Sequence, residues 1–137
     1  MRNLRPIMLV EDDVVDAMAV NRALQDLEVP NELVCVNNGE EALNYLQDNG
    51  NEKPGIILLD LNMPRMNGIE LLKAVKNNES LKRIPVIVLT TSSAEQDINE
   101  SFAMSVAGYM VKPVDYKDFL DLIKTIDNYW TLNQLPT

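Results

Sequence analysis

The sequence predicts an α/β fold in which helices cover both faces of a five-stranded parallel sheet. Five short apolar runs alternate along the chain with longer segments whose apolar residues recur at helical spacing. Three of these runs are apolar without interruption, which is typical of strands buried on both faces of a parallel sheet. Because strands alternate with helices, each of the first four helices is expected to cross over between two parallel strands.

The apolar runs are the predicted strands. They are Ile7–Val10, Leu33–Val36, Ile56–Leu59, Val86–Leu89 and Val106–Val111. Right-handed crossovers leave few topologies, and the flavodoxin-like strand order 2-1-3-4-5 is expected for this doubly wound (βα)5 arrangement. In such a sheet the functional crevice lies at the carboxyl ends of the strands.

The first two predicted helices are Val14–Leu27 and Gly39–Leu46. In the first, the apolar residues at roughly helical spacing are Val14, Val15, Met18, Leu24 and Leu27. These residues are expected to face the core. The second repeats the spacing with Ala42, Leu43 and Leu46.

The other predicted helices are Gly68–Val75, Glu95–Met104 and Asp115–Trp130. The last of them is strongly amphipathic, whereas Glu95–Met104 has only Ile98 and Phe102 as large apolar anchors. We therefore expect this fourth helix to be the most weakly held of the five.

The chain has 137 residues, of which 46 % are apolar and 24 % charged. This fits one folded unit over residues 1–130 with a short tail over 131–137. No apolar run approaches the roughly 20 residues that span a bilayer, and acidic residues come too early for a secretory signal. The single cysteine, Cys35, cannot form an internal disulfide, so a soluble cytoplasmic protein is expected.

Charge and residue content exclude several functions. The net charge of −9 argues against binding nucleic acid through the domain surface. The chain contains no histidine, so it cannot carry a phosphohistidine, a Ser-His-Asp triad or a histidine metal site. A phosphate acceptor in this chain must therefore be another type of residue.

Polar residues follow the first, third, fourth and fifth strands at their carboxyl ends, where the fold forms its crevice. They are Glu11, Asp12 and Asp13, then Asp60, then Thr90, Thr91 and Ser92, and finally Lys112 and Pro113. Each group alone has an ordinary structural interpretation, such as a helix cap at Asp13 or a turn at Pro113. Their joint occurrence at one edge of the sheet favours a functional site.

The acidic residues suit a metal-assisted phosphoryl acceptor. Asp60 can attack a phosphoryl group and form an acyl phosphate. Asp12, helped by Glu11, can bind Mg²⁺ together with Asp60, because Mg²⁺ prefers oxygen ligands and keeps several waters. The main-chain carbonyl of Asn62, just past the strand end, is a natural further ligand.

Lys112 and Thr90 complete this chemistry. Lys112 can place a mobile positive charge on a phosphoryl oxygen, and Thr90 can donate a hydrogen bond to another. Catalysis would then consist mostly of positioning and charge neutralisation.

Four motifs carry a resemblance to a known family: IMLVEDD, IILLDLNMPRMNG, IPVIVLTTSS and GYMVKP. With them, the chain resembles a response-regulator receiver domain, the module that accepts phosphate from a sensor histidine kinase. The intervals from Asp60 to Thr90, 30 residues, and from Asp60 to Lys112, 52 residues, also suit that family. The resemblance covers residues 6–130.

The resemblance implies a role for each residue of the acidic group. Asp60 would be the phosphoacceptor. Glu11 and Asp12 would be the acidic pair, with Asp12 the more direct Mg²⁺ ligand and Asn62 contributing its main-chain carbonyl. Asn62 and Ser92 occupy positions that vary in the family and tune hydrolysis by water.

The resemblance also implies a switch. Thr90 would be the switch hydroxyl and Tyr109 the switch aromatic, while Lys112 would be joined to Pro113 by a cis peptide that aims the lysine into the crevice. Phosphorylation would draw Thr90 toward a phosphoryl oxygen, and the ring of Tyr109 would turn into the vacated space. The face made by the fourth helix, fifth strand and fifth helix would then change shape.

Three further positions shape access to the acceptor. Pro64 and Gly68 are expected to form the loop after Asp60. Thr91 departs from the family, which usually has a small residue there, often alanine. Its extra methyl and hydroxyl are expected to affect phosphate entry or the lifetime of the phosphoryl group.

The implied function is that of a stand-alone response regulator in a two-component phosphorelay. Its partners would be a sensor histidine kinase or a histidine phosphotransfer protein, and a downstream protein that the sequence does not identify. The ending DLIKTIDNYWTLNQLP resembles single-domain regulators that accompany bacteriophytochrome or hybrid sensor kinases and often dimerise through their last helices. Tyr129 and Trp130 would belong either to such an interface or to a cap over the core.

Three other functions compete with this interpretation. An aspartyl-nucleophile, Mg²⁺-dependent phosphatase usually needs a second aspartate two residues after the nucleophile, and Asn62 stands there. A flavin or nucleotide carrier is disfavoured because the chain has no G-x-G-x-x-G motif or P-loop. A binding scaffold that works without phosphate is disfavoured by the complete set of site residues. The expected protein is therefore not an enzyme, although it assists its own phosphorylation and dephosphorylation.

Overall fold

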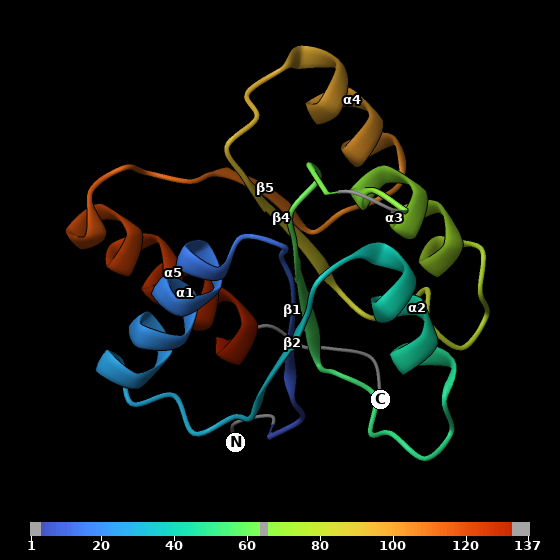
Figure 1. Ribbon diagram of the computed structural model, residues 1–137, viewed down its shortest axis with the longest axis horizontal. Coiled ribbons are helices and arrows are strands. Elements are labelled where there is room, and N and C mark those ends of the chain that lie inside the picture. Colours follow the sequence, from blue (N-terminus) through green and yellow to red (C-terminus); the bar gives the residue numbers. More distant parts are fainter. Residues whose placement is uncertain (1–3, 64–65, 133–137) are drawn as a thin grey trace.

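The computed structural model describes residues 4–63 and 66–132 and confirms the predicted fold (Figure 1). Five parallel strands form one sheet in the order β2-β1-β3-β4-β5. Helices alternate with the strands along the chain, and all the strand pairings are parallel. The sheet is therefore the doubly wound, flavodoxin-like one.

The strands are β1 (Ile7–Val10), β2 (Leu33–Val36), β3 (Ile56–Leu59), β4 (Val86–Thr90) and β5 (Gly108–Val111). The first three have the predicted bounds, and β5 begins two residues later than predicted. The main-chain N–H of Val106 still bonds back to the carbonyl of Ser101, so the chain reaches the sheet only at Ala107, whose N–H donates to the carbonyl of Val86.

The helices are α1 (Val14–Asp26), α2 (Gly39–Gln47), α3 (Gly68–Lys76), α4 (Glu95–Ala103) and α5 (Tyr116–Leu132). Their ends lie within two residues of the predicted ones. Figure 1 shows α1 and α5 on one side of the sheet and α2, α3 and α4 on the other. The molecule thus has three layers, as expected for alternating strands and helices.

Two apolar cores fill the spaces between the sheet and the helices. Alternate residues along each strand point to opposite faces, so Val10 and Leu59 pack toward α2 and α3, while Leu9 and Leu58 pack toward α1 and α5. The central strands β1, β3 and β4 are buried along their whole length, whereas the edge strands β2 and β5 are partly exposed. The uninterrupted apolar runs therefore mark the strands with neighbours on both sides.

The apolar face predicted for α1 is wrong at the start of the helix. Val14, Val15 and Met18 are 71, 74 and 66 % exposed. The residues of α1 that are buried are Val20, Ala23 and Leu24. These three residues lie on one face of the helix, and helical spacing toward the N-terminus extends that face to Ala17, which packs against the core. The three exposed residues lie outside this face.

Of the two anchors predicted for α4, Ile98 is half-buried, and the prediction for Phe102 is wrong. Phe102 is 53 % exposed, and of the nine residues of α4, all of them described, only Ser101 is buried. The prediction that α4 is weakly anchored is confirmed, and the anchoring is weaker than the sequence indicated. In α5, by contrast, Trp130 is 2 % exposed and belongs to the core that it shares with α1.

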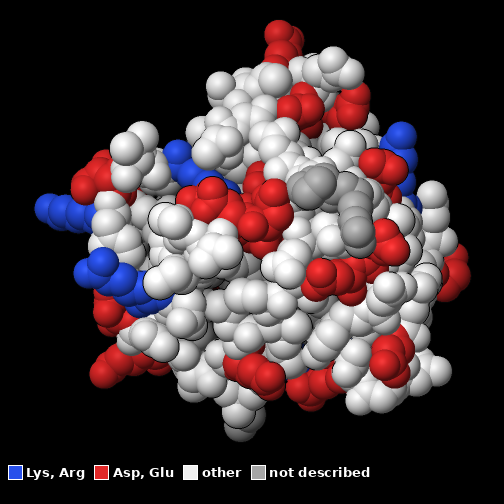
Figure 2. Space-filling model, in the orientation of Figure 1, with Lys and Arg blue, Asp and Glu red and all other residues white. Residues whose placement is uncertain are grey.

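The carboxyl ends of the strands lie at one edge of the sheet. The register aligns Val10 with both Val36 and Leu59, and Thr90 with Val111, so that residues following these strands are brought together. Figure 2 shows acidic side chains gathered at the centre of the face, beyond the ends of the central strands. Within residues 4–63 and 66–132, no helix is both long and apolar enough to cross a bilayer.

Candidate functional site

Asp60 stands at the end of β3, in the middle of the sheet. Its main-chain N–H donates to the carbonyl of Val10, so the parallel ladder continues to this residue and holds its backbone firmly. The residue is 7 % exposed. A carboxylate at this depth is unusual without partners, and each of its oxygens faces one.

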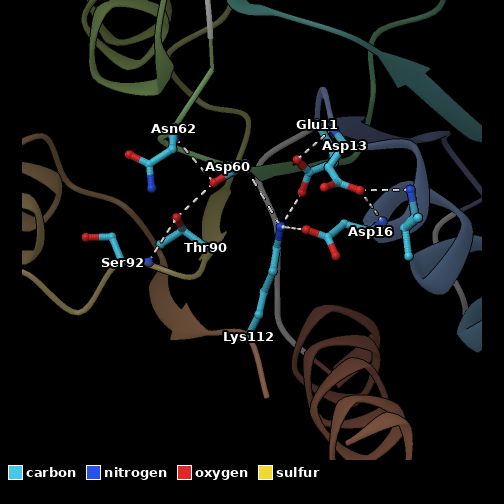
Figure 3. Close-up of polar contacts among 9 residues, drawn as sticks. Glu11, Asp13, Asp16, Asp60, Asn62, Thr90, Ser92 and Lys112 are labelled. Atoms are coloured by element: carbon cyan, nitrogen blue, oxygen red, sulfur yellow. Dashed lines mark hydrogen bonds and ion pairs between the residues drawn. The ribbon is translucent and has the colours of Figure 1, made fainter. Parts of the chain in front are cut away.

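Thr90 and Lys112 face the two oxygens of Asp60 (Figure 3). Thr90, which is fully buried, donates a hydrogen bond from Oγ1 to Asp60 Oδ1 over 2.8 Å. Lys112 Nζ lies 3.9 Å from Asp60 Oδ2. The main chains are aligned for this, because the N–H of Lys112 donates to the carbonyl of Thr90 over 2.8 Å.

Glu11 and Asp12 complete an acidic cluster with Asp60. One ligand oxygen from each of the three residues lies within 4.8 Å of the others. Glu11 is 4 % exposed, whereas Asp12 is exposed at the mouth of the site. Three carboxylates with one open side fit a hard divalent cation such as Mg²⁺ or Mn²⁺, which takes oxygen ligands and retains water.

The ammonium group of Lys112 lies among three carboxylates. Nζ donates to Glu11 Oε1 and, over 3.0 Å, to Asp16 Oδ2, in addition to facing Asp60 (Figure 3). The lysine side chain is only 7 % exposed. The positive charge is therefore held inside the site and not spread into solvent.

Burial and charge shift the pKa values of this pair. Burial raises the pKa of Glu11 to about 7, although the hydrogen bond from Lys112 lowers it. Burial lowers the pKa of Lys112, but the hydrogen bonds to Glu11 and Asp16 outweigh it, so the pKa lies above its usual value. The lysine is thus cationic at neutral pH. A cation near Glu11 would favour its charged form.

Tyr109 lies next to the loop that follows β4. Its hydroxyl donates to the main-chain carbonyl of Ser92 over 2.9 Å, and its ring packs partly against the core beneath α2 and α3. Ser92 in turn donates from Oγ to Asp97 Oδ2 in α4. A chain of contacts therefore leads from Tyr109 through this loop to α4.

The structure differs from the expectation for Pro113. Among the described residues no peptide bond is cis, so the bond between Lys112 and Pro113 is trans. The trans form is the more stable isomer of such bonds by about 0.5–1 kcal/mol. The lysine also reaches the acidic cluster in this form, so the cis isomer is not needed to aim it.

The loop after Asp60 is only partly described. Pro64 lies outside the described residues, and the main-chain N–H of Asn62 donates to Asp60 Oδ1 over 3.3 Å. A Cβ on Gly68 would lie 2.6 Å from the Cα of Leu61 and 2.7 Å from the carbonyl oxygen of Asp60. Glycine is required there because the start of α3 lies directly against the strand end. Thr91 is exposed beside the site.

Asp16 is a site residue that the sequence did not reveal. It lies in the first turn of α1, where an acid is ordinarily explained by the helix dipole. The signal in the sequence was weak: a fourth acid close after Glu11, Asp12 and Asp13. Only the tertiary structure, which brings the first turn of α1 to the residue that follows β5, places it against Lys112. Asp13, by contrast, has its predicted role as the cap of α1.

The fold and the cluster at the strand ends have the arrangement that the motifs predicted, and comparisons with known proteins identify the family. The sequence model of one protein family, the response regulator receiver domain, matches residues 7–124 of this chain. The chain belongs to this family of two-component system proteins.

Named relatives support the membership. The chain is 38 % identical over 128 residues to the response regulator Rcp1 of Synechocystis sp., covering 90 % of this chain and 87 % of the relative. A crystal structure of the phosphorylated cyanobacterial phytochrome response regulator RcpA superposes with a TM-score of 0.92 at 38 % identity, covering 98 % of this chain and 100 % of the other. The Mn²⁺-bound form of Rcp1 gives a TM-score of 0.90 at 36 % identity, with coverage of 97 and 99 %. The resemblance to a response-regulator receiver domain, stated from the motifs, is therefore confirmed.

Proposed function

We propose that the chain accepts a phosphoryl group on Asp60 from a phosphohistidine of a sensor kinase or of a histidine phosphotransfer protein. One observation carries the proposal: Thr90 and Lys112 face different oxygens of this one carboxylate. A phosphoryl group joined to Asp60 would have a hydroxyl donor on one side and an ammonium group on the other. These are the groups that bind phosphoryl oxygens.

The transfer would be a substitution at phosphorus. A carboxylate oxygen of Asp60 forms a bond to phosphorus, the bond from phosphorus to the donor imidazole breaks, and the imidazole nitrogen keeps the electron pair. Lys112 and Thr90 orient the phosphoryl oxygens, so the chain contributes mostly position and charge. Water later hydrolyses the acyl phosphate and restores the carboxylate. The protein thereby assists its own phosphorylation and dephosphorylation without being an enzyme for a separate substrate.

Glu11, Asp12 and Asp60 would hold Mg²⁺, with the main-chain carbonyl of Asn62 as a further ligand. The acidic cluster and the existence of a Mn²⁺-bound relative support this assignment. When bound, the cation would neutralise negative charge between the carboxylate and the phosphoryl group.

The switch would run from Thr90 to Tyr109. In this structure the hydroxyl of Thr90 donates a hydrogen bond to Asp60, and the hydroxyl of Tyr109 donates one to the main-chain carbonyl of Ser92 in the loop before α4. Phosphorylation adds charge and acceptor oxygens at Asp60, and would stabilise this arrangement over one in which both side chains have turned away. The face formed by α4, β5 and α5 would then present a different shape to a downstream protein. Wild-type and Tyr109→Ala chains giving the same phosphate-dependent NMR shifts on that face would contradict the switch.

The partners follow from the same assignment. The donor would be a histidine kinase, and the similarity to the phytochrome response regulator RcpA supports a kinase of the phytochrome class. A homodimer through the C-terminal helix has support from two exposed side chains of α5, Tyr129 at 43 % and Leu132 at 82 %. We further propose one receiver domain over residues 1–130 that works in the cytoplasm, with no nucleic acid among its ligands, in keeping with the net charge of −9.

Phosphorylation by a small-molecule donor tests the proposal. Wild-type chain is incubated with acetyl phosphate and Mg²⁺, and its intact mass should rise by about 80 Da, the mass of one phosphoryl group. The increase should be absent in Asp60→Asn and after Mg²⁺ is removed with a chelator. Asp118→Asn, an exposed acid in α5, serves as the matched control and should be labelled like wild type.

The alternatives make different predictions in the same assay. Labelling of Asp60→Asn, or no labelling of wild type, would refute Asp60 as acceptor. Continuous release of phosphate from a phosphomonoester would instead indicate a phosphatase. Binding of beryllofluoride, which mimics the phosphoryl group on a carboxylate, gives an independent measure in the absence of turnover.

A further inference from the structure

We infer that Asp16 is a positioning residue, which holds the ammonium group of Lys112 in the orientation that receives a phosphoryl group on Asp60. The inference rests on the function proposed above for Asp60. Asp16 would touch neither the phosphoryl group nor the cation, and would act through Lys112.

The start of α1 leaves the carboxylate of Asp16 available for this contact. Asp13 is the N-cap, and its Oδ1 accepts hydrogen bonds from the N–H groups of Val15 and Asp16 over 2.8 and 3.1 Å. An acid three residues after the cap usually bonds back to the N–H of the cap residue. Here that N–H donates instead to Glu11 Oε2 over 3.3 Å.

Helix α3 provides the contrast within the same chain. Its cap, Asn67, is followed three residues later by Glu70, and the two form a complete capping box. Glu70 Oε1 accepts from the N–H of Asn67 over 3.2 Å. In α1 it is Glu11 that accepts from the N–H of the cap residue. The carboxylate of Asp16 contacts Lys112 instead, with 3.0 Å between Asp16 Oδ2 and Lys112 Nζ.

The surroundings of Lys112 give Asp16 a distinct part among the three acids. Glu11 and Asp60 both belong to the acidic cluster that fits a cation, whereas Asp16 lies outside it. The side chain of Asp16 is 39 % exposed, against 2 and 9 % for the other two. Asp16 is thus the partner whose charge is not shared with the cluster.

Two hydrogen bonds orient the ammonium group. Lysine has a flexible stem and three rotating donors, so one contact alone leaves its direction open. Glu11 and Asp16 each accept one hydrogen bond from the ammonium group of Lys112. The third N–H of the ammonium group is then left to point toward Asp60. The ordering of Lys112 is then completed before the phosphoryl group arrives, which lowers the entropy cost of the transfer.

The test compares Asp16→Asn with Glu70→Gln. Each variant removes one negative charge from the third position of a helix, but only the first removes a contact of Lys112. We expect Asp16→Asn to be phosphorylated by acetyl phosphate about tenfold more slowly than wild type, because a small misplacement of an orienting group costs this much or more. Glu70→Gln should stay within about twofold, and Asp16→Glu, which keeps the carboxylate, should recover most of the rate.

A second readout does not depend on phosphorylation. The ¹⁵N NMR signal of Lys112 Nζ, identified by its loss in Lys112→Arg, should shift in Asp16→Asn and stay in place in Glu70→Gln. An unmoved signal in Asp16→Asn would overturn the inference. So would a wild-type or faster rate in Asp16→Asn, or an equal loss in Glu70→Gln, which would indicate an effect of the helix start alone.

The two proposals fail in different ways. If wild type is not labelled at all, the acceptor role of Asp60 fails, and the Lys112 signal still decides whether Asp16 orients the lysine. If wild type is labelled and Asp16→Asn is labelled equally fast, only the positioning role fails.

Discussion

Helices α3 and α4 have the same length and follow neighbouring strands, yet they are held in opposite ways. α3 follows β3, begins with a complete capping box, and buries Gly68, Leu71, Leu72 and Val75. α4 follows the strand that ends in Thr90, has Ala94 as an N-cap that makes no side-chain hydrogen bond, and buries Ser101. The helix after Asp60 is thus firmly capped and packed, whereas the helix after Thr90 has few buried contacts, which is typical of elements of low local stability.

This difference suits a switch. Under the proposed function, the carboxylate of Asp60 has to stay in place for transfer, and the start of α3 lies directly against its backbone. Under the same proposal, the surface that includes α4 has to change shape on phosphorylation for a small free-energy change. Few side chains of α4 are buried, so little packing would be disrupted. The uneven packing of α3 and α4 is therefore in keeping with the proposed function.

The largest effect on stability is expected when one apolar side chain is removed from α3 and, for comparison, one from α4. Leu72→Ala should lower the free energy of unfolding by about 2–5 kcal/mol, because Leu72 is 1 % exposed and its loss leaves a cavity. Phe102→Ala should change it by less than about 0.5 kcal/mol, since more than half of that ring is already in solvent. Urea denaturation measures both, and similar losses would refute the contrast.

Gly68→Ala tests how closely α3 supports the acceptor. The new methyl would meet the backbone of Asp60 and Leu61, so the free energy of unfolding should fall by about 1–3 kcal/mol despite the better helix propensity of alanine. Phosphorylation should slow as Asp60 is displaced. Gly50→Ala is the control, because its Cβ would meet only the side chain of Asp48. Equal stability of the two variants would show that the contact is not tight.

Removing the cap of α3 or adding a cap to α4 should narrow the difference in stability between the two helices. Asn67→Ala breaks the capping box of α3 and should cost about 1 kcal/mol. Ala94→Ser supplies α4 with a capping hydroxyl and should add about 0.5–1 kcal/mol. Hydrogen exchange resolves the effect by element, and amides of α4 should become better protected in Ala94→Ser. If their protection is unchanged, capping does not limit the stability of α4.

The smallest effect is expected at Ser101. Its hydroxyl is buried and, within residues 4–63 and 66–132, has no hydrogen-bond partner. Ser101→Ala should therefore raise the free energy of unfolding by up to about 1 kcal/mol. Ser80→Ala, in which the lost hydroxyl is exposed and bonded to Asn78, should be neutral or slightly destabilising. A clear loss of stability in Ser101→Ala would mean that the hydroxyl has a partner.

Local patterns predicted most of the fold. Uninterrupted apolar runs identified β1, β3 and β4, since only strands with neighbours on both sides can bury every residue. The order of the sheet followed from alternating elements and right-handed crossovers. The faces of α1 and α4 were predicted less well, because which residues of a helix meet the sheet depends on how the helix is rotated against it.

The amino-acid sequence by itself determined the strands, their order, and the residues that follow their carboxyl ends. Asp60, Thr90, Lys112, Glu11 and Asp12 were all identified in this way, because strand ends and polar residues are both local features of the chain. Only the tertiary structure decided that Asp16 would reach Lys112, that the peptide before Pro113 would be trans, and that Val14, Val15 and Met18 would face solvent. These depend on the distance and rotation between elements far apart in the chain, which packing sets and which no local pattern records.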